Sequence, residues 1–399
     1  MTGRNETLRN DEYIDRELES YHEDDAPLGG IDIPFFLLTV LILVIGVIMV
    51  LSASFARAYS EDGRPAYYFI RQSLFAIMGI AVMLLASRLP VSFYRRVSMP
   101  LLVVSILLLA AVPLIGHKAG GARRWINLGF TTFQPSELAK LAVVMSFAYL
   151  ICKFKDKMRT FKYGILPFFG ILAIIVGLLI LEPHLSASVI IIAIGAIMLF
   201  IGGVNISWFV IGALVVGLAG YVLIGKMGYA ASRIASWKDP FIDPLGDGFQ
   251  VIQSLYAIGS GGLMGLGLGQ GRQKYLYLPE EHNDFIFSVY CEELGYIGAV
   301  LILILFALLI LRGYYIALNA KTKYGSLVAT GLTSLLAIQV FLNVAVVTNL
   351  IPCTGISLPF FSYGGTALLV QLMEMGIILA VSREIPLKQK KKRQNTPEN

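Results

Sequence analysis

Continuous apolar windows of about 20 residues recur along this 399-residue chain, and they constrain its fold more than any other feature. A helix of that length crosses a hydrocarbon layer about 30 Å thick, where lipid offers no partner to an unpaired backbone group. The sequence therefore predicts an all-α, polytopic membrane protein with about ten transmembrane helices. A β-barrel is excluded because the apolar runs are continuous instead of alternating. The ten windows are 32–54, 67–87, 98–115, 135–152, 164–181, 187–202, 206–226, 284–311, 325–349 and 364–382.

Composition supports this class. Charged residues make up 15% of the chain, whereas soluble proteins carry about 25%. The three cysteines are scattered and odd in number, so they predict neither a disulfide framework nor a CxxC metal site. The first 31 residues lack the basic start and short apolar core of a cleavable signal peptide.

Charge in the connections predicts the orientation of the helices. An even number of spans places both termini on one side, and the connections on that side carry more lysine and arginine than those opposite. Positive loops stay inside, so both termini are expected in the cytoplasm. We expect residues 1–31 to be an acidic, disordered cytoplasmic tail, residues 32–385 the transmembrane domain, and residues 386–399 a basic cytoplasmic tail. The basic tail is typical of a solvated segment near anionic lipid, and no nucleic-acid partner is expected.

The longest connection, residues 227–283 between the seventh and eighth helices, then lies outside the cell. Nearly sixty residues without a spanning helix is unusual for a simple connector and indicates a functional segment. Residues 248–259 have apolar positions at helical spacing, which predicts a helix lying in the interface. The glycines at 261–271 follow no predicted strand and precede no GK[ST], so close backbone approach or flexibility is the interpretation, not a nucleotide loop.

Polar side chains also occur where hydrocarbon makes them costly. Glu137 and Lys140 share one helix face at i, i+3, and two interpretations stay open: a structural ion pair, or the wall of a polar cavity. Gln339 and Asn343, one turn apart, favour interhelical hydrogen bonding. Asp284 stands at the mouth of a long apolar run. A carboxylate there loses hydration, and its pKa can rise towards that of a general base.

Several motifs resemble those of the SEDS family (shape, elongation, division and sporulation). The segment 349–366, NLIPCTGISLPFFSYGGT, is similar to the family signature. Arg124-Trp125 with QPSELAK, then EPHL, then the block from DPFIDPLGDGFQVIQS to LPEEHNDFIF and EELG match further family motifs in the same order. The resemblance covers about residues 32–385, and the extracellular block resembles FtsW and SpoVE more than RodA. Two positions depart from the family pattern: His184 stands where aspartate is frequent, which leaves its role open, and Asn283 stands where threonine is frequent.

The resemblance implies a peptidoglycan glycosyltransferase that polymerises lipid II, an undecaprenyl-diphosphate-linked disaccharide peptide, outside the bacterial cytoplasmic membrane at the division septum. It implies a monofunctional class B penicillin-binding transpeptidase and other divisome membrane proteins as partners. Asp284 falls on the family's essential aspartate and is expected to be the general base. Mg²⁺ or Mn²⁺ would neutralise the diphosphate, with ligands unassigned, and no organic cofactor is expected. Substrate-binding residues are expected at Arg124, Trp125, Glu137, Lys140, Arg233, Lys274, His282, Ser362 and Gly364.

The chemistry agrees with such a site. Lipid II carries its sugar through an α-linked diphosphate and the glycan is β-linked, so transfer inverts the anomeric carbon. One base must activate the attacking hydroxyl, while the diphosphate leaves as a stable anion that needs neighbouring cations and no acid. One carboxylate with several cations is therefore sufficient, unlike the carboxylate pair of a glycoside hydrolase.

Two other functions fit the same sequence. A lipid II flippase or other transporter would use the intramembrane polar residues as a translocation path, and a scaffold for the division machinery would need no chemistry. The enzyme is favoured because the densest polar cluster lies outside, where polymerisation occurs. Formation of glycan polymer by the purified protein separates the three functions.

A partner helix is expected against the helices at 284–311 and 325–349. The second of these carries a small-residue face that permits close packing, with internal packing as the alternative. The residues of that face are Gly331, Ser334, Ala337, Asn343 and Ala345.

Overall fold

A computed structural model describes residues 29–385, except 120–121, 130, 227 and 247. The two predicted tails therefore lie outside the described residues, apart from 29–31. Each of the ten predicted windows coincides with a helix, and the polytopic all-α class is confirmed. The helices are α2 (Ile33–Asp62), α3 (Tyr67–Arg88), α4 (Val91–Ile115), α5 (Pro135–Phe154), α6 (Leu166–Leu181), α7 (Leu185–Ile201), α8 (Ile206–Lys226), α11 (Ile286–Leu318), α12 (Lys323–Val347) and α13 (Gly365–Arg383).

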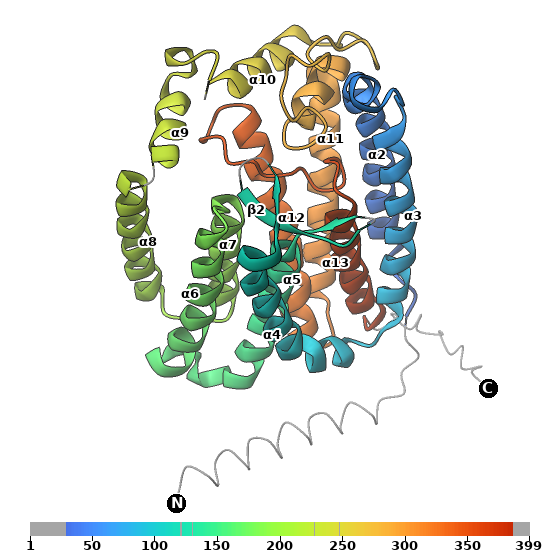
Figure 1. Cartoon of the computed structure of the whole chain (residues 1–399). Helices are drawn as coiled ribbons and strands as arrows, with labels where there is room; N and C mark the ends of the chain where they lie inside the picture. The colour runs from blue at the N-terminus through green and yellow to red at the C-terminus, as the bar shows by residue number, and fades with distance from the viewer. Residues whose placement is uncertain (1–28, 120–121, 130, 227, 247, 386–399) are drawn as a thin grey trace, which may run out of the picture.

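Seven helices among the described residues are long and apolar enough to cross a membrane by length and composition. They stand roughly side by side in one bundle (Figure 1). Within their most apolar windows, α12 is 67% buried and α13 is 72% buried, whereas α11 is 22% buried. The core of the bundle therefore contains α12 and α13, and α11 presents most of its surface to the surroundings.

Two helices are longer than a membrane requires. At 1.5 Å per residue, the 30 residues of α2 and the 33 residues of α11 span about 45 and 50 Å, against a hydrocarbon layer of about 30 Å. The backbone of α11 breaks at Gly295, where φ is 68° and ψ is −168°. Residues 286–294 form a separate outer piece above this break, next to α10 at the end of the bundle drawn uppermost in Figure 1.

Among its described residues, the segment 227–283 contains no helix long and apolar enough to span a membrane. It folds into α9 (Gly228–Lys238), the short helix η3 (Pro240–Ile242) and α10 (Phe249–Ser260), which confirms the amphipathic helix predicted at 248–259. The glycine-rich part pairs with the broken α11: Leu266 and Gly267 donate backbone N–H groups to the carbonyls of Glu292 and Glu293, both at 3.0 Å. A Cβ at Gly265 would lie 2.1 Å from the Glu293 carbonyl oxygen, so close backbone approach is the reason for glycine there.

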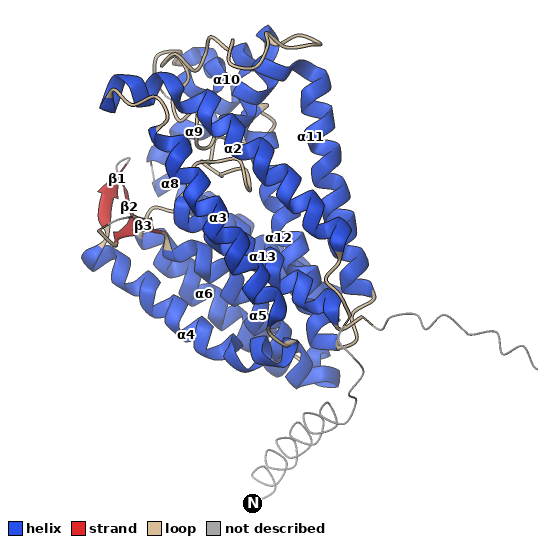
Figure 2. Cartoon of the chain, turned by 90° about the vertical axis from the view of Figure 1, so that its right-hand side faces the viewer, coloured by secondary structure: helices blue, strands red, loops and turns tan. Residues whose placement is uncertain are grey.

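A small antiparallel sheet was not expected from the sequence. It lies between α4 and α5 and consists of β1 (His117–Ala119), β2 (Ala122–Asn127) and β3 (Thr132–Phe133), in that order across the sheet. Figure 2 shows it at one edge of the helical bundle. The strands are two to six residues long, too short for an alternating pattern to stand out. The sheet matters because β2 carries Arg124 and Trp125.

Candidate active site

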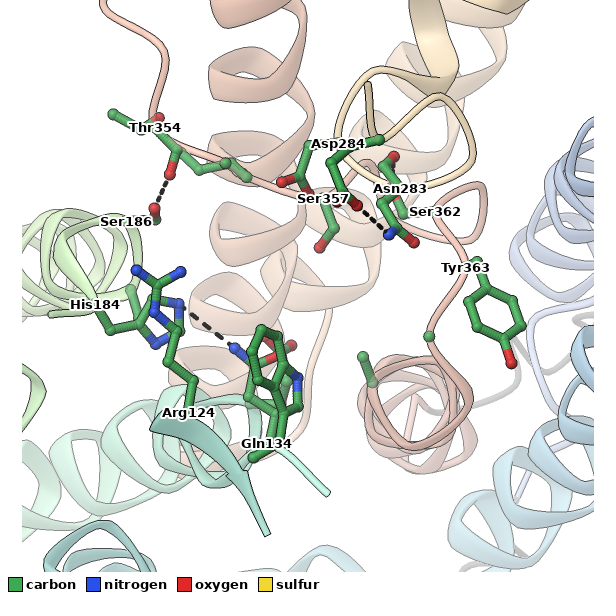
Figure 3. A pocket seen from close by; sticks show the side chains of 18 of the residues that line it. Arg124, Gln134, His184, Ser186, Asn283, Asp284, Thr354, Ser357, Ser362 and Tyr363 are labelled. Carbon is green, nitrogen blue, oxygen red and sulfur yellow. Dashed lines mark hydrogen bonds between the residues drawn. The ribbon is translucent and has the colours of Figure 1, made fainter. Parts of the chain in front are cut away.

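A cavity of about 1130 Å³ lies between the bundle and the outer segments. Figure 3 shows residues that line it. They come from sequence positions as far apart as Arg71 and Gln371. Eight of the ten predicted site residues line this cavity: Arg124, Trp125, Glu137, Lys140, Arg233, Asp284, Ser362 and Gly364.

Asp284 lies immediately before α11, and its peptide is fixed by the core of the bundle. The side-chain amide of Asn343 on α12 donates to the backbone oxygen of Asp284 at 2.8 Å and to that of Ile356 at 2.6 Å. A Cβ at Gly355 would lie 3.0 Å from the Asp284 carboxylate, so the signature segment approaches the acid closely. Burial, and then the negative charge of Glu280, raise the pKa of Asp284 from 3.8 to about 6.

The signature segment 349–366 makes hydrogen bonds to the backbone of the residues next to Asp284. The Ser362 hydroxyl donates to the Asn283 backbone oxygen at 2.8 Å and accepts from the Leu358 N–H at 2.7 Å. The Tyr363 N–H donates to the His282 oxygen at 2.9 Å. Ser362 therefore joins the Asp284 loop to the signature segment, and it also lines the cavity.

Three of the predicted cations line the cavity, each from a different element. Arg124 comes from β2 and donates to the Pro183 oxygen; Arg233 comes from α9 and donates to the Cys353 oxygen. Lys140 comes from α5, where its Nζ lies 2.8 Å from Glu137 Oε2. The positive charges of Arg124 and Arg233 act on Asp284 and partly offset the rise in its pKa. Both expectations for Glu137 and Lys140 are met together, because the two form an ion pair and line the cavity.

Lys274 and His282 do not line the cavity, which corrects two predicted contacts. Lys274 is 2% exposed, and its Nζ lies 2.7 Å from Glu293 Oε1 and 3.0 Å from the Ser52 hydroxyl, so its charge is neutralised inside the protein. The His282 ring packs against Tyr68 and Tyr363, with centroids 4.7 and 5.8 Å away. His282 therefore anchors the loop that carries Asp284.

Sequence reasoning missed several lining residues, among them Arg71, Gln134 and Glu280. Arg71 carried a usable signal, because a cation inside an apolar helix usually faces a polar interior. The segment between α6 and α7 was singled out without a role. Its Glu182 is 2% exposed, and burial raises the pKa of Glu182 to about 8 although Arg124 opposes that rise.

The bundle, with a half-buried carboxylate and several cations lining one cavity, defines a polytopic membrane protein with a candidate group-transfer site. The family model described as "Cell cycle protein", which covers FtsW, RodA and SpoVE, matches residues 33–386. This chain belongs to that family.

Relatives and solved structures agree with the family. Stage V sporulation protein E of Bacillus subtilis (strain 168) is 43% identical over 355 residues, which cover 88% of this chain and 97% of that protein. A probable peptidoglycan glycosyltransferase FtsW of Trichlorobacter lovleyi is 41% identical over 363 residues, covering 90% and 95%. A chain from a peptidoglycan synthase complex that coordinates polymerization and crosslinking has a TM-score of 0.74 at 30% identity, covering 88% and 98%. Rod shape determining protein RodA of Thermus thermophilus has a TM-score of 0.66 at 27% identity, covering 90% and 98%.

Proposed function

We propose that this chain is a peptidoglycan glycosyltransferase that polymerises lipid II at the outer face of the cytoplasmic membrane during division or sporulation. The observation that carries the proposal is a single carboxylate, Asp284, with its pKa raised to about 6, in a cavity that also holds Arg124, Lys140 and Arg233. The names of the relatives support the same reaction.

Each group has a role in an inverting transfer. Asp284 accepts the proton of the attacking sugar hydroxyl as the new glycosidic bond forms, and its raised pKa suits a base that works near neutral pH. The bond from the anomeric carbon to the diphosphate breaks, and the diphosphate leaves with the electron pair. Arg124, Lys140 and Arg233 then stabilise the developing negative charge inside the cavity, where charges are screened less than in bulk water.

A divalent cation fits this cavity when the substrate supplies ligands. Among the residues that the structure describes, no three His, Cys, Asp or Glu side chains form a metal site by themselves. Asp284 and Glu280 both line the cavity, and Mg²⁺ is usually held by one or two carboxylates together with phosphate oxygens. Glu280 would hold Mg²⁺ or Mn²⁺ together with phosphate oxygens, and the bound ion would neutralise the diphosphate, while Asp284 stays free to accept the proton.

The partner in this proposal is a single-span penicillin-binding transpeptidase, and the family's structure of a synthase complex supports it. The small-residue face of α12 does not serve the partner, because a Cβ at Gly331 would meet Val144 and Met198 inside the bundle. That face serves internal packing. The helix α11 instead has an exposed stripe at alternating spacings of four and three, the repeat of a coiled-coil seam. The stripe consists of Ile297, Leu301, Ile304, Leu308, Leu311, Tyr315 and Leu318.

Orientation and place in the cell follow from the same proposal. With both termini in the cytoplasm, the outer segment and the cavity face the side where glycan strands are made. Septal location follows from a role in division or sporulation.

The decisive experiment is polymerisation of lipid II by the purified protein, with and without its transpeptidase. We expect Asp284→Asn to lower the rate about 10²–10⁴-fold, because the change keeps the side-chain volume and removes the base. A flippase would move fluorescent lipid II across vesicles and form no glycan, and a scaffold would do neither. Near-normal polymerisation by the Asn variant would contradict the assignment of Asp284.

A further inference from the structure

The start of α7 opens onto the cavity. Only Glu182, Pro183 and His184 separate α6 from α7, and His184 is the residue at the N-terminal cap of α7. The His184 side chain makes no capping hydrogen bond. The first amides of a helix have no carbonyl within the helix to bond, and they carry the positive end of its dipole. Residues 185–187, which bear these amides, line the cavity.

His184 adds a hydrogen-bond donor at the same place. Its Nε2 lies 3.4 Å from the Gln134 side-chain nitrogen. An amide NH₂ only donates, so His184 Nε2 accepts, and the proton of a neutral ring then sits on Nδ1. Nδ1 is buried and has no hydrogen-bond partner among the described residues, although His184 lines the cavity. Burial, and the cations Arg124 and Lys140, lower the pKa of His184 to about 3, which keeps the ring neutral.

This combination indicates the kind of ligand. His184 is 6% exposed, and leaving its Nδ1–H unbonded costs free energy that an acceptor atom would recover. A sugar hydroxyl or an acetamide oxygen would satisfy the donor, but neither explains the cations. Arg124 lies close enough to His184 to act on it and contacts the Pro183 oxygen next to it. A helix N-terminus beside two cations binds negatively charged oxygens.

We propose that the N-terminus of α7 and His184 bind the diphosphate of the lipid-linked sugar, with His184 Nδ1–H and the amides of residues 185–187 as donors. The assignment rests on the proposed function, because that reaction supplies a diphosphate. Figure 3 shows His184 beside Arg124, with Asp284 elsewhere on the cavity wall.

The test measures binding of undecaprenyl diphosphate to the purified full-length protein in detergent by native mass spectrometry. We expect His184→Leu to weaken binding at least about tenfold, because hydrogen bonds to charged groups are among the strong ones. His184→Asn places an amide N–H near the position of Nδ1 and should stay within about threefold of the unaltered protein. His184→Gln places its amide near Nε2 instead and should bind like the Leu variant. Ser146→Ala is the matched control, since Ser146 is buried in α5 and its hydroxyl donates to the Val143 oxygen of the same helix.

The comparison of Asn with Gln decides the outcome even when the Leu variant does not fold. Equal affinity of these two variants, or unchanged affinity of a folded Leu variant, overturns the assignment of His184. Inorganic pyrophosphate serves as a second probe: the same dependence on residue 184 identifies the phosphates, and not the lipid, as the recognised group. If the protein binds undecaprenyl diphosphate through His184 but never polymerises lipid II, the site stands and the proposed function fails. If it polymerises lipid II and the variants bind undecaprenyl diphosphate unchanged, the proposed function stands and the site fails.

Discussion

Asp284 is held through its peptide, and the donor that holds it comes from the middle of the bundle. Asn343 is fully buried and bonds the backbone oxygens of both Asp284 and Ile356. One amide therefore fixes two non-helical segments relative to each other. Because the bonds are made to the backbone, the carboxylate keeps its acceptor sites for a substrate hydroxyl.

The effect of Glu280 on the pKa of Asp284 allows the role of Asp284 as the base to be tested through the pH dependence of the rate. The rate should fall about tenfold per unit below pH 6, since protonated Asp284 cannot accept a proton. Glu280→Gln removes a negative charge that raises the pKa of Asp284, so the acid limb of kcat/KM should move to lower pH. Measuring polymerisation from about pH 4.5 to 8 would check the shift.

The control for this shift is Glu61→Gln. Glu61 is an exposed acid that accepts a hydrogen bond from Tyr68 and lies outside the cavity lining. Its variant should keep the acid limb in place. An acid limb that stays fixed in the Glu280 variant would show that another group controls it.

For individual residues, sequence motifs located several side chains of the cavity but could not show which of their charges are neutralised by a partner. Asp284 and Arg124 were found because their motifs match the family in order. Lys274 was misjudged because the sequence does not show that its ammonium group pairs with Glu293 inside the protein, with Ser52, 222 residues away, as a second partner. No role was predicted for His184, because its role depends on a contact with Gln134, which lies 50 residues earlier in the chain.

Among the elements, α5 carries a buried charge pair, Glu137 and Lys140, that also lines the cavity. Glu137→Ala and Lys140→Ala should each destabilise the protein by about 3–5 kcal/mol, since each leaves one buried charge without its partner. The double swap Glu137→Lys with Lys140→Glu should restore thermal stability and leave polymerisation impaired, because the cation then stands at the wrong position. Full activity of the swapped protein would mean that the pair is structural alone.

The pairing of the glycine-rich segment with α11 predicts a sharp difference between two glycines. Gly265 has φ of +80° and no room for a Cβ, so Gly265→Ala should lower the melting temperature and the activity. Gly177 lies inside α6 with no atom within 4 Å of a Cβ, and Gly177→Ala should raise helix stability by about 0.5–1 kcal/mol. Thermal unfolding of both variants in the same detergent would check this. Equal effects would argue against the observed pairing.

The elements themselves were largely predictable, for a physical reason. Hydrocarbon thickness fixes the length of an apolar helix, so the ten helices follow from hydropathy. Hydrocarbon thickness does not determine the structure of segments that extend beyond the membrane. The outer piece of α11 and the sheet at 117–133 are fixed by tertiary contacts, which hydropathy does not record.

For the molecule as a whole, the exposed stripe on α11 predicts where the partner helix packs. Cysteines at Leu308 and Leu311 should crosslink in membranes to cysteines in the transmembrane helix of the transpeptidase. Ile174 on α6 is also exposed and gives the matched control, which should not crosslink. Efficient crosslinking from Ile174, with none from Leu308 or Leu311, would move the partner to another face.

The ion pairs of α2 have a consequence for biosynthesis. Arg57 makes two hydrogen bonds to Glu281, which lies 224 residues later in the chain, and Ser52 meets Lys274 and Glu293. At about 5–20 residues per second, the ribosome needs on the order of 11–45 seconds to make the chain between Arg57 and its partner. Until then, α2 lies in the bilayer without the partners of Ser52 and Arg57. The contacts that join α2 to the segment before α11 therefore form late in synthesis, after most of the helices have been inserted.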